Sequence, residues 1–303
     1  MLGIIAVNAI AFTHAFKFSH FDTSGKKTVK PEELTLPQKL TILLTGISNP
    51  KPKNTLLPTR PFETLKIKTH HDYTLDTWHI KADNSLGTVL LFHGYTGKKS
   101  DMLDEAEAFL NMGYNTVLVD FYGSGDSDGA ATSVGYFEGE DVANTYNHIA
   151  ATGEKNIILF GASMGAVAIA NATANHHIQP QSLVLECPYG KLLTTVENRF
   201  DLMGVPSLGF AHLLVFWGGA QDGYWAFNLN TIEFAKKIKA PTLLLHGAKD
   251  QRAPMDEVEA IHQNLQGLKQ LTVFPEAAHE SYLTSTPEAW KKSVHQFLTK
   301  NTP

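Results

Sequence analysis

The sequence predicts an α/β fold built on a mostly parallel, doubly wound sheet, with antiparallel N-terminal edge strands and a helical cap insertion. From residue 87 onward, short apolar segments alternate with segments of helical periodicity, which is typical of parallel strands joined by crossover helices. Before that point, residues 62–80 alternate apolar and polar side chains, which indicates an antiparallel pair at a sheet edge. An aromatic, charge-poor stretch at residues 189–228 breaks the alternation and predicts the insertion.

The predicted elements follow one another closely in the main body, residues 55–303. Each strand is a short, unbroken apolar run, as expected where helices cover both faces of a parallel sheet. Beyond the antiparallel pair, the predicted strands cover residues 88–92, 115–120, 157–160, 182–186, 241–245 and 271–274, and the predicted helices cover residues 101–112, 137–151, 166–174, 255–265 and 287–298.

Residues 1–54 are predicted to form an N-terminal helical extension and a linker. Residues 1–12 are nearly all apolar but fall short of the roughly 20 that a membrane span requires. Three interpretations stay open: a helix docked on the body, an interfacial anchor in peripheral contact with a membrane, or the stump of a longer hydrophobic segment. We favour the first two. A second helix is predicted at residues 31–47, and the proline-containing residues 49–54 predict a stiff, solvated linker.

The composition describes an ordinary globular protein. Of 303 residues, 43% are hydrophobic and 18% are charged. The formal net charge is −5 and no basic stripe is present, so we expect no nucleic-acid partner. The single cysteine, Cys187, excludes an internal disulfide and a cysteine-rich metal cluster, and is expected to be a small core residue. It fits a reducing compartment, which favours the cytoplasm, with membrane association through the N-terminal segment as the alternative.

A Gly161-Ala162-Ser163-Met164-Gly165 segment lies between the strand at 157–160 and an alanine-rich helix. In that context, G-x-S-x-G predicts a nucleophile elbow, a sharp turn that exposes the Ser163 hydroxyl above the sheet edge. We expect glycines on either side because a Cβ would collide with the neighbouring strand or helix. The Met164 N–H then lies at a helix start, where negative charge is favoured. A glycine-rich structural turn with a surface serine is the alternative.

A serine hydroxyl needs an adjacent base that is itself oriented by an acid. In a parallel sheet, such groups are expected on loops at the carboxyl ends of strands. Asp250 follows the strand at 241–245 and His279 follows the strand at 271–274, and the order Ser163, Asp250, His279 accompanies a strand–elbow–helix nucleophile. Glu186, which also ends a strand, is the alternative acid.

A developing oxyanion requires two donors, and the sequence offers the backbone N–H groups of Tyr95 and Met164. Tyr95 lies in a loop at the carboxyl end of the strand at 88–92. The insertion at 189–228 predicts a cap that lines an apolar substrate pocket, although additional core is the alternative. The pocket residues expected there are Phe210, Leu214 and Trp217.

Two histidine pairs raise the question of a metal site. His70-His71 and His176-His177 are each adjacent in sequence, and adjacent side chains diverge in a strand or a helix. We find no carboxylate or cysteine in the sequence pattern that completes a ligand set. We therefore expect solvated surface histidines, no metal and no cofactor.

Five motifs together carry a resemblance to a known family: HGYTG from His93, DFYGSGDSDG from Asp120, GASMG from Gly161, HGAKDQRAP from His246 and AAHES from Ala277. From about Phe62 to the C-terminus, the chain resembles the α/β-hydrolases, in particular the serine aminopeptidase/monoacylglycerol lipase-like, carboxylesterase-type branch. The resemblance implies that Ser163 is the nucleophile, His279 the general base and then acid, and Asp250 the orienting carboxylate. It also implies that Tyr95 and Met164 form the oxyanion hole.

The expected activity is hydrolysis of a small-molecule carboxylic ester with an apolar portion, through an acyl-enzyme. The first alternative is amide cleavage by the same triad, as in an aminopeptidase, for which Glu197 and Asp201 in the insertion offer thin support. The second alternative is a non-catalytic interaction module that binds through the cap and the N-terminal helix. The sequence argues against it, because every triad and oxyanion position is chemically competent.

Overall fold

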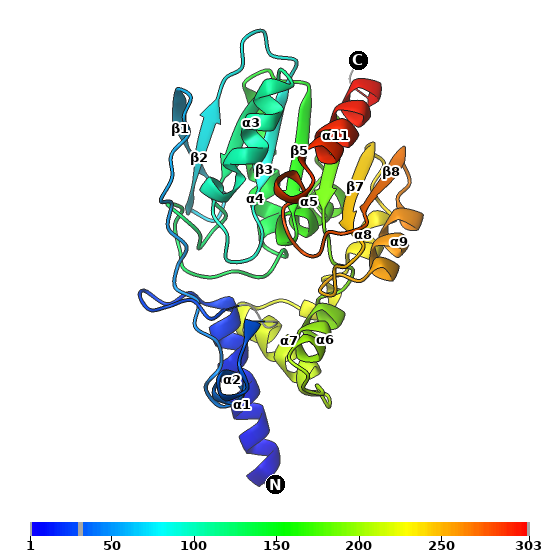
Figure 1. Cartoon of the computed structure of the whole chain (residues 1–303). Helices are drawn as coiled ribbons and strands as arrows, with labels where there is room; N and C mark the ends of the chain where they lie inside the picture. The colour runs from blue at the N-terminus through cyan, green and yellow to red at the C-terminus, as the bar shows by residue number, and fades with distance from the viewer. Residues whose placement is uncertain (1, 30–32, 302–303) are drawn as a thin grey trace.

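The computed structural model describes residues 2–29 and 33–301 and is built around one eight-stranded sheet in the order β1-β2-β4-β3-β5-β6-β7-β8 (Figure 1). β1 pairs with β2 and β2 with β4 in antiparallel register, whereas all pairs from β4 to β8 are parallel. The predicted sheet is therefore confirmed. The strands are β1 (Phe62–Lys68), β2 (Thr74–Ile80), β3 (Thr88–Phe92), β4 (Asn115–Val119), β5 (Ile157–Ala162), β6 (Ser182–Glu186), β7 (Thr242–Gly247) and β8 (Lys269–Phe274).

Helices cover both faces of this sheet, and β5 shows why its sequence is apolar throughout. Ile158 and Phe160 belong to the core on the side of α3 (Leu103–Asn111) and α11 (Pro287–Asn301). Ile157 and Leu159 alternate with them and belong to the core on the opposite face. That second core is covered by α4 (Glu138–Ala151), α5 (Met164–Asn175), α8 (Thr231–Ala235) and α9 (Met255–Asn264).

Several element boundaries differ from the predicted ones. The helix expected at 101–112 is divided into a short 3₁₀ helix, η2 (Lys99–Met102), and α3. The short helices α8 and α10 (Tyr282–Ser285) were not predicted, because four or five residues are too few to show a helical period.

A helical cap interrupts the alternation between β6 and α8, as the sequence predicts. It contains α6 (Leu192–Leu202), α7 (Phe210–Asp222) and the 3₁₀ helix η3 (Ala226–Asn228). Figure 1 shows α6 and α7 gathered with the two N-terminal helices at one end of the sheet. The cap and the N-terminal extension thus lie on the same side of the body.

The N-terminal extension contains α1 (Leu2–Ser19) and α2 (Leu36–Thr45). α1 docks along α7, where Trp217 Nε1 donates to Asn8 Oδ1 at 3.2 Å and Gln221 Nε2 donates to the Phe12 carbonyl at 2.8 Å. α2 is shorter than the predicted helix, and residues 31 and 32 of that prediction lie outside the described residues. Within those residues, no helix combines the length and the apolarity needed to cross a bilayer.

The segment at 49–54 is not a solvated linker, and that prediction is wrong. Lys51 Nζ donates to two backbone carbonyls in the loop at 120–129, at 2.7 and 2.9 Å. Asn54 Nδ2 lies 2.8 Å from a carboxylate oxygen of Asp120. The polar side chains that suggested solvation instead satisfy hydrogen-bonding groups of that loop, which fixes the segment against the body.

Candidate active site

Ser163 lies at the sharp turn between β5 and α5, with an unusual backbone conformation of φ 52° and ψ −113°. The glycines on either side of Ser163 are required because neither position has room for a side chain. A Cβ at Gly161 would come within 2.6 Å of the Gly165 carbonyl carbon, and a Cβ at Gly165 would come within 2.2 Å of the Phe92 oxygen in β3. The collisions expected from the sequence are therefore present, and the turn holds Ser163 at the carboxyl end of β5.

Three side chains that are distant in sequence meet at this end of the sheet. Ser163 Oγ is 3.0 Å from His279 Nε2, and His279 Nδ1 is 2.7 Å from Asp250 Oδ2. His279 lies in the loop after β8 and Asp250 in the loop after β7. The other Asp250 oxygen accepts the backbone N–H groups of Arg252 and Ala253 at 2.9 and 3.0 Å. The carboxylate is thereby held in one orientation toward the imidazole.

The electrostatic environment keeps Asp250 ionised. Burial favours the neutral acid, but the hydrogen bond and charge of His279, together with the two backbone amides, outweigh burial and lower the pKa of Asp250. An ionised carboxylate at this distance accepts the Nδ1 proton of His279, which leaves the Nε2 lone pair directed at Ser163. The arrangement can remove the proton from the serine hydroxyl.

Glu186, the alternative acid, has other partners. Its Oε2 accepts the Trp290 indole N–H at 2.8 Å, and its Oε1 accepts the Tyr282 backbone N–H at 3.5 Å. Burial, and then the charge of Glu105, raise the pKa of Glu186 to about 8. The structure thus places Asp250, not Glu186, against the imidazole.

The loop that follows β3 packs directly on the turn at Ser163. A Cβ at Gly94 would make ordinary contact with the Ser163 Cβ, at 3.5 Å, so the two backbones are close neighbours. Tyr95 comes next in this loop, and Met164 is the first residue of α5, where the amide has no partner one turn earlier in the helix. The Met164 side chain packs in the core.

The Tyr95 side chain joins this loop to the N-terminal extension. Its ring stacks on Phe18 with a centroid distance of 4.6 Å, and its hydroxyl donates to the Phe18 carbonyl at 2.7 Å. The same hydroxyl accepts Asn49 Nδ2 at 2.8 Å. The guanidinium of Arg199, from α6, lies 5.2 Å from the Phe18 ring centroid. Sequence reasoning did not identify this contact, because no local pattern shows where α1 docks.

A largely apolar cavity of about 430 Å³ reaches Ser163 and His279. The predicted pocket residues Phe210 and Leu214 line it, but Trp217 does not. Trp217 instead packs against α1, with its ring 5.4 Å from that of Phe12. The apolar walls come from the cap and from the extension, and include Phe18, Ile42, Leu43, Val196, Phe200 and Val215.

His93 and Cys187, which each follow a strand, are both buried within the protein. His93 is fully buried; its Nε2 accepts the Phe121 N–H, so its Nδ1 proton is directed to the Gly94 carbonyl at 2.8 Å. Burial lowers the pKa of His93 and keeps it neutral. Cys187 is a buried core residue, as expected, and lies beside Asp250 and His279.

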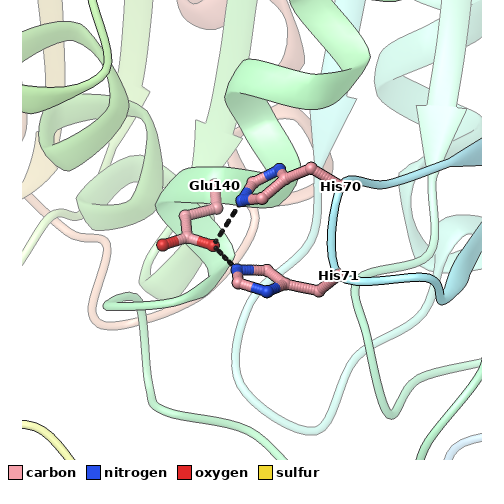
Figure 2. Close-up of side chains that lie close together, drawn as sticks. All are labelled: His70, His71 and Glu140. Carbon is pink, nitrogen blue, oxygen red and sulfur yellow. Dashed lines mark hydrogen bonds and ion pairs between the residues drawn. The ribbon is translucent and has the colours of Figure 1, made fainter.

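A group of two histidines and a glutamate, separate from the triad, lies where the turn between β1 and β2 meets α4. Figure 2 shows His70 and His71 both directed at Glu140. The expectation that adjacent histidines diverge is wrong here, because they occupy the middle of a tight turn closed by the Asp72 N–H and the Thr69 carbonyl. The side-chain alternation of a strand does not apply in such a turn.

Comparisons with known proteins agree with this architecture. A model of the serine aminopeptidase family S33 matches residues 83–209, and a model of the dienelactone hydrolase family matches residues 208–299. The chain is 25% identical over 239 residues to the protein YqkD of Bacillus subtilis, covering 77% of each chain. It is 24% identical over 281 residues to the α/β-hydrolase domain-containing protein WAV2 of Arabidopsis thaliana, covering 86% of each chain.

A solved structure with the same fold is that of the esterase Pf2001 of Pyrococcus furiosus. It matches with a TM-score of 0.72 and 24% identity, over 84% of this chain and 97% of that chain. At this identity, the similarity shows the fold: a mostly parallel sheet with antiparallel first strands, flanked by helices.

Proposed function

We propose that the chain is an α/β-hydrolase of the serine aminopeptidase and esterase branch that hydrolyses carboxylic esters with Ser163 as the nucleophile; the two family matches and the shared esterase fold support this. The observation that supports this proposal most is the continuous line of contacts from Ser163 Oγ through His279 to Asp250, at 3.0 and 2.7 Å, beside an apolar cavity. A nucleophile, a base and an orienting acid within hydrogen-bond reach are the groups that acyl transfer requires.

In the first half of the proposed reaction, Ser163 Oγ attacks the ester carbonyl while His279 Nε2 accepts the hydroxyl proton. Asp250 stabilises the resulting imidazolium through Nδ1. The negative charge that develops on the carbonyl oxygen is stabilised by the backbone N–H groups of Tyr95 and Met164. The tetrahedral intermediate then expels the alcohol, which leaves with the proton from His279, and an acyl-enzyme on Ser163 remains.

In the second half, a water molecule attacks the acyl carbonyl while His279 Nε2 accepts one of its protons. The second tetrahedral intermediate breaks its bond to Ser163 Oγ, which takes the proton back from His279, and the carboxylic acid departs. The reaction uses side chains and backbone groups of this chain together with water.

The cavity favours a substrate with an apolar acyl or alcohol portion of modest size. Its walls are mainly aliphatic and aromatic, and among the described residues that line it, the carboxylate is that of Asp222. Glu197 and Asp201, the candidates for binding a free amino group, are not among those lining residues. The two carboxylates named from the sequence therefore give aminopeptidase activity no support, and Asp222 is the lining carboxylate that could contact an amino group.

Labelling with a fluorophosphonate probe tests the proposal directly. We expect one covalent adduct on Ser163 in the wild-type protein and none in Ser163→Ala or His279→Ala, with circular dichroism confirming that all three are folded. Absence of the adduct from folded wild-type protein would favour a non-catalytic binding module. Hydrolysis of p-nitrophenyl esters of graded chain length, compared with aminoacyl arylamides, then measures the bond preference, and faster arylamide cleavage would contradict ester specificity.

A further inference from the structure

Two histidines and a glutamate from distant parts of the chain converge at the surface. His71 Nε2 lies 2.8 Å from Glu140 Oε2, and His70 Nε2 lies 3.5 Å from the same oxygen (Figure 2). One ligand atom from each of the three residues falls within 4.8 Å of the others. Their side chains are 59%, 54% and 21% exposed for His70, His71 and Glu140, so an ion from solution can reach them.

The spacing of these atoms is close to that of a metal site. A tetrahedral zinc ion with metal–nitrogen and metal–oxygen distances near 2.1 Å separates its donors by roughly 3.4 Å. The separations to the Glu140 oxygen, 2.8 and 3.5 Å, lie on either side of this value. Small rotations of exposed side chains are enough to equalise them.

The side-chain amide of Asn144 favours the tautomer of His70 that metal binding through Nε2 requires. His70 Nδ1 lies 3.3 Å from Asn144 Oδ1, one turn along α4 from Glu140. An amide oxygen accepts a proton from Nδ1, which leaves the Nε2 lone pair of His70 available at the centre of the group. Histidine ligands of metals usually have such a partner on the nitrogen that does not bind the ion.

The scaffold around the three ligands is held by other bonds. The Thr69 N–H donates to the Tyr73 carbonyl at 2.9 Å, which closes the base of the turn. The Tyr73 hydroxyl donates to Asp141 Oδ1 at 2.5 Å, and the Tyr122 N–H donates to the other Asp141 oxygen at 2.9 Å. The turn and α4 are therefore fastened together beside the ligands, so an ion does not need to organise the backbone.

A cluster of three aspartates elsewhere in the protein differs from this site, because it already contains a cation. Asp76, Asp120 and Asp126 also converge, but Lys99 Nζ already lies 2.6–2.8 Å from all three. Glu140 instead faces two imidazoles, which present lone pairs when they are neutral. The first cluster contains its own cation, whereas the second offers a negative charge and two nitrogen donors.

From this geometry we propose that His70, His71 and Glu140 bind a divalent transition-metal ion of the zinc class, with water completing the coordination. Two imidazoles and one carboxylate suit Zn²⁺ better than Mg²⁺ or Ca²⁺, which prefer oxygen ligands. The bound ion links the β1–β2 turn to α4. This proposal stands independently of the proposed esterase activity.

The test is calorimetric titration of Zn²⁺ into the full chain, produced without a polyhistidine tag and freed of metal by a chelator. We expect one site, and a loss of affinity of at least about 100-fold in His71→Ala and in Glu140→Gln, with a smaller loss of about 10-fold in Asn144→Ala. His295→Ala removes an exposed histidine from α11 and serves as the matched control, with unchanged affinity. Mg²⁺ at the same concentration is expected not to bind.

A second readout separates this site from the triad, because Cys187, Asp250 and His279 also bring ligand atoms within 4.8 Å of one another. At the proposed site, Zn²⁺ raises the melting temperature of the wild type but not of His71→Ala, and fluorophosphonate labelling of Ser163 is unaffected. Binding of equal affinity in wild type and His71→Ala, or Zn²⁺ that blocks labelling in both, would overturn the proposal. So would the absence of binding to the folded wild type.

Discussion

The triad and the His70, His71 and Glu140 group both bring imidazole and carboxylate groups together, and they differ in burial. In the first, the Asp250 side chain is fully buried and His279 is 17% exposed. In the second, Glu140 is 21% exposed and His71 is 54% exposed. The distances between nitrogen and oxygen are nearly equal, 2.7 and 2.8 Å, so distance alone does not distinguish the two pairs.

The surroundings make the difference. Asp250 is oriented by two backbone amides and contacts one imidazole, whose other nitrogen faces a hydroxyl at the edge of a cavity. Glu140 instead shares one oxygen between two imidazoles that are open to water. A buried carboxylate in a fixed position orients a base. An exposed carboxylate that contacts two imidazoles brings three potential metal-ligand atoms close together.

The largest expected effect is the loss of turnover in Ser163→Ala and His279→Ala. Because nucleophile and base act as a unit, each variant should lower kcat for a p-nitrophenyl ester by about 10⁵-fold or more, and the double variant should be no worse than either. Steady-state kinetics on protein shown to be folded measures this. Appreciable esterase activity in Ser163→Ala would mean that another nucleophile carries the reaction.

A paired substitution sharpens the contrast between the two carboxylates. Asp250→Asn should lower kcat by about 10⁴-fold, because an amide no longer stabilises the imidazolium or fixes its tautomer. Glu140→Gln should leave the same rate unchanged, because Glu140 contacts no group of the triad. Comparable losses in both variants would contradict the distinction drawn here.

Glu186→Gln tests the role of Glu186, the alternative acid. The quantity measured is the free energy of unfolding as a function of pH. Since the pKa of Glu186 is raised to about 8 from its usual 4.5, the folded protein holds a proton that the unfolded chain releases between these values. The free energy of unfolding therefore falls as pH rises from about 4.5 to 8, by up to about 1.4 kcal/mol per pH unit from this group.

In Glu186→Gln that decline should be shallower, with activity retained. The replacement keeps an oxygen for the Trp290 indole N–H. Part of the slope should remain, because burial also raises the pKa of Glu105. Urea unfolding at several pH values measures the change. A variant that lost activity as severely as Asp250→Asn would reverse the assignment of the acid.

The smallest expected effect is that of His71→Ala in metal-free protein. An exposed imidazole beside a partly exposed carboxylate contributes little, so the free energy of unfolding should change by less than about 0.5 kcal/mol. Urea unfolding measures it, with His295→Ala as the control. A larger loss would show that the turn depends on His71 even without an ion.

The sequence predicts most of the body because its signals are local. An apolar run followed by Gly161 and an alanine-rich helix places Ser163 at a strand end, and two further strand ends give Asp250 and His279. A parallel sheet brings those ends to one edge, so positions along the chain translate into a meeting in space. The geometry agrees with this, while the chemical roles remain predictions.

What the sequence does not reveal depends on contacts between distant segments. No local pattern indicates that the 49–54 segment bonds to the loop after β4, or that the α7 face bearing Trp217 meets α1 instead of the cavity. The same holds for the histidine turn, whose partner Glu140 lies about seventy residues away on a helix. Periodicity identifies elements, but it does not identify which faces pack together.

The stacking of Tyr95 on Phe18 has a practical consequence for how this chain is handled. A shortened protein that begins near residue 55 would lack both residues that hydrogen-bond to the Tyr95 hydroxyl, and one wall of the cavity beside Ser163. Although the family motifs all lie after residue 54, deletion of the extension would disturb the loop that carries Tyr95, whose backbone N–H is expected to stabilise the oxyanion. The N-terminal extension is therefore expected to be needed for the proposed esterase activity.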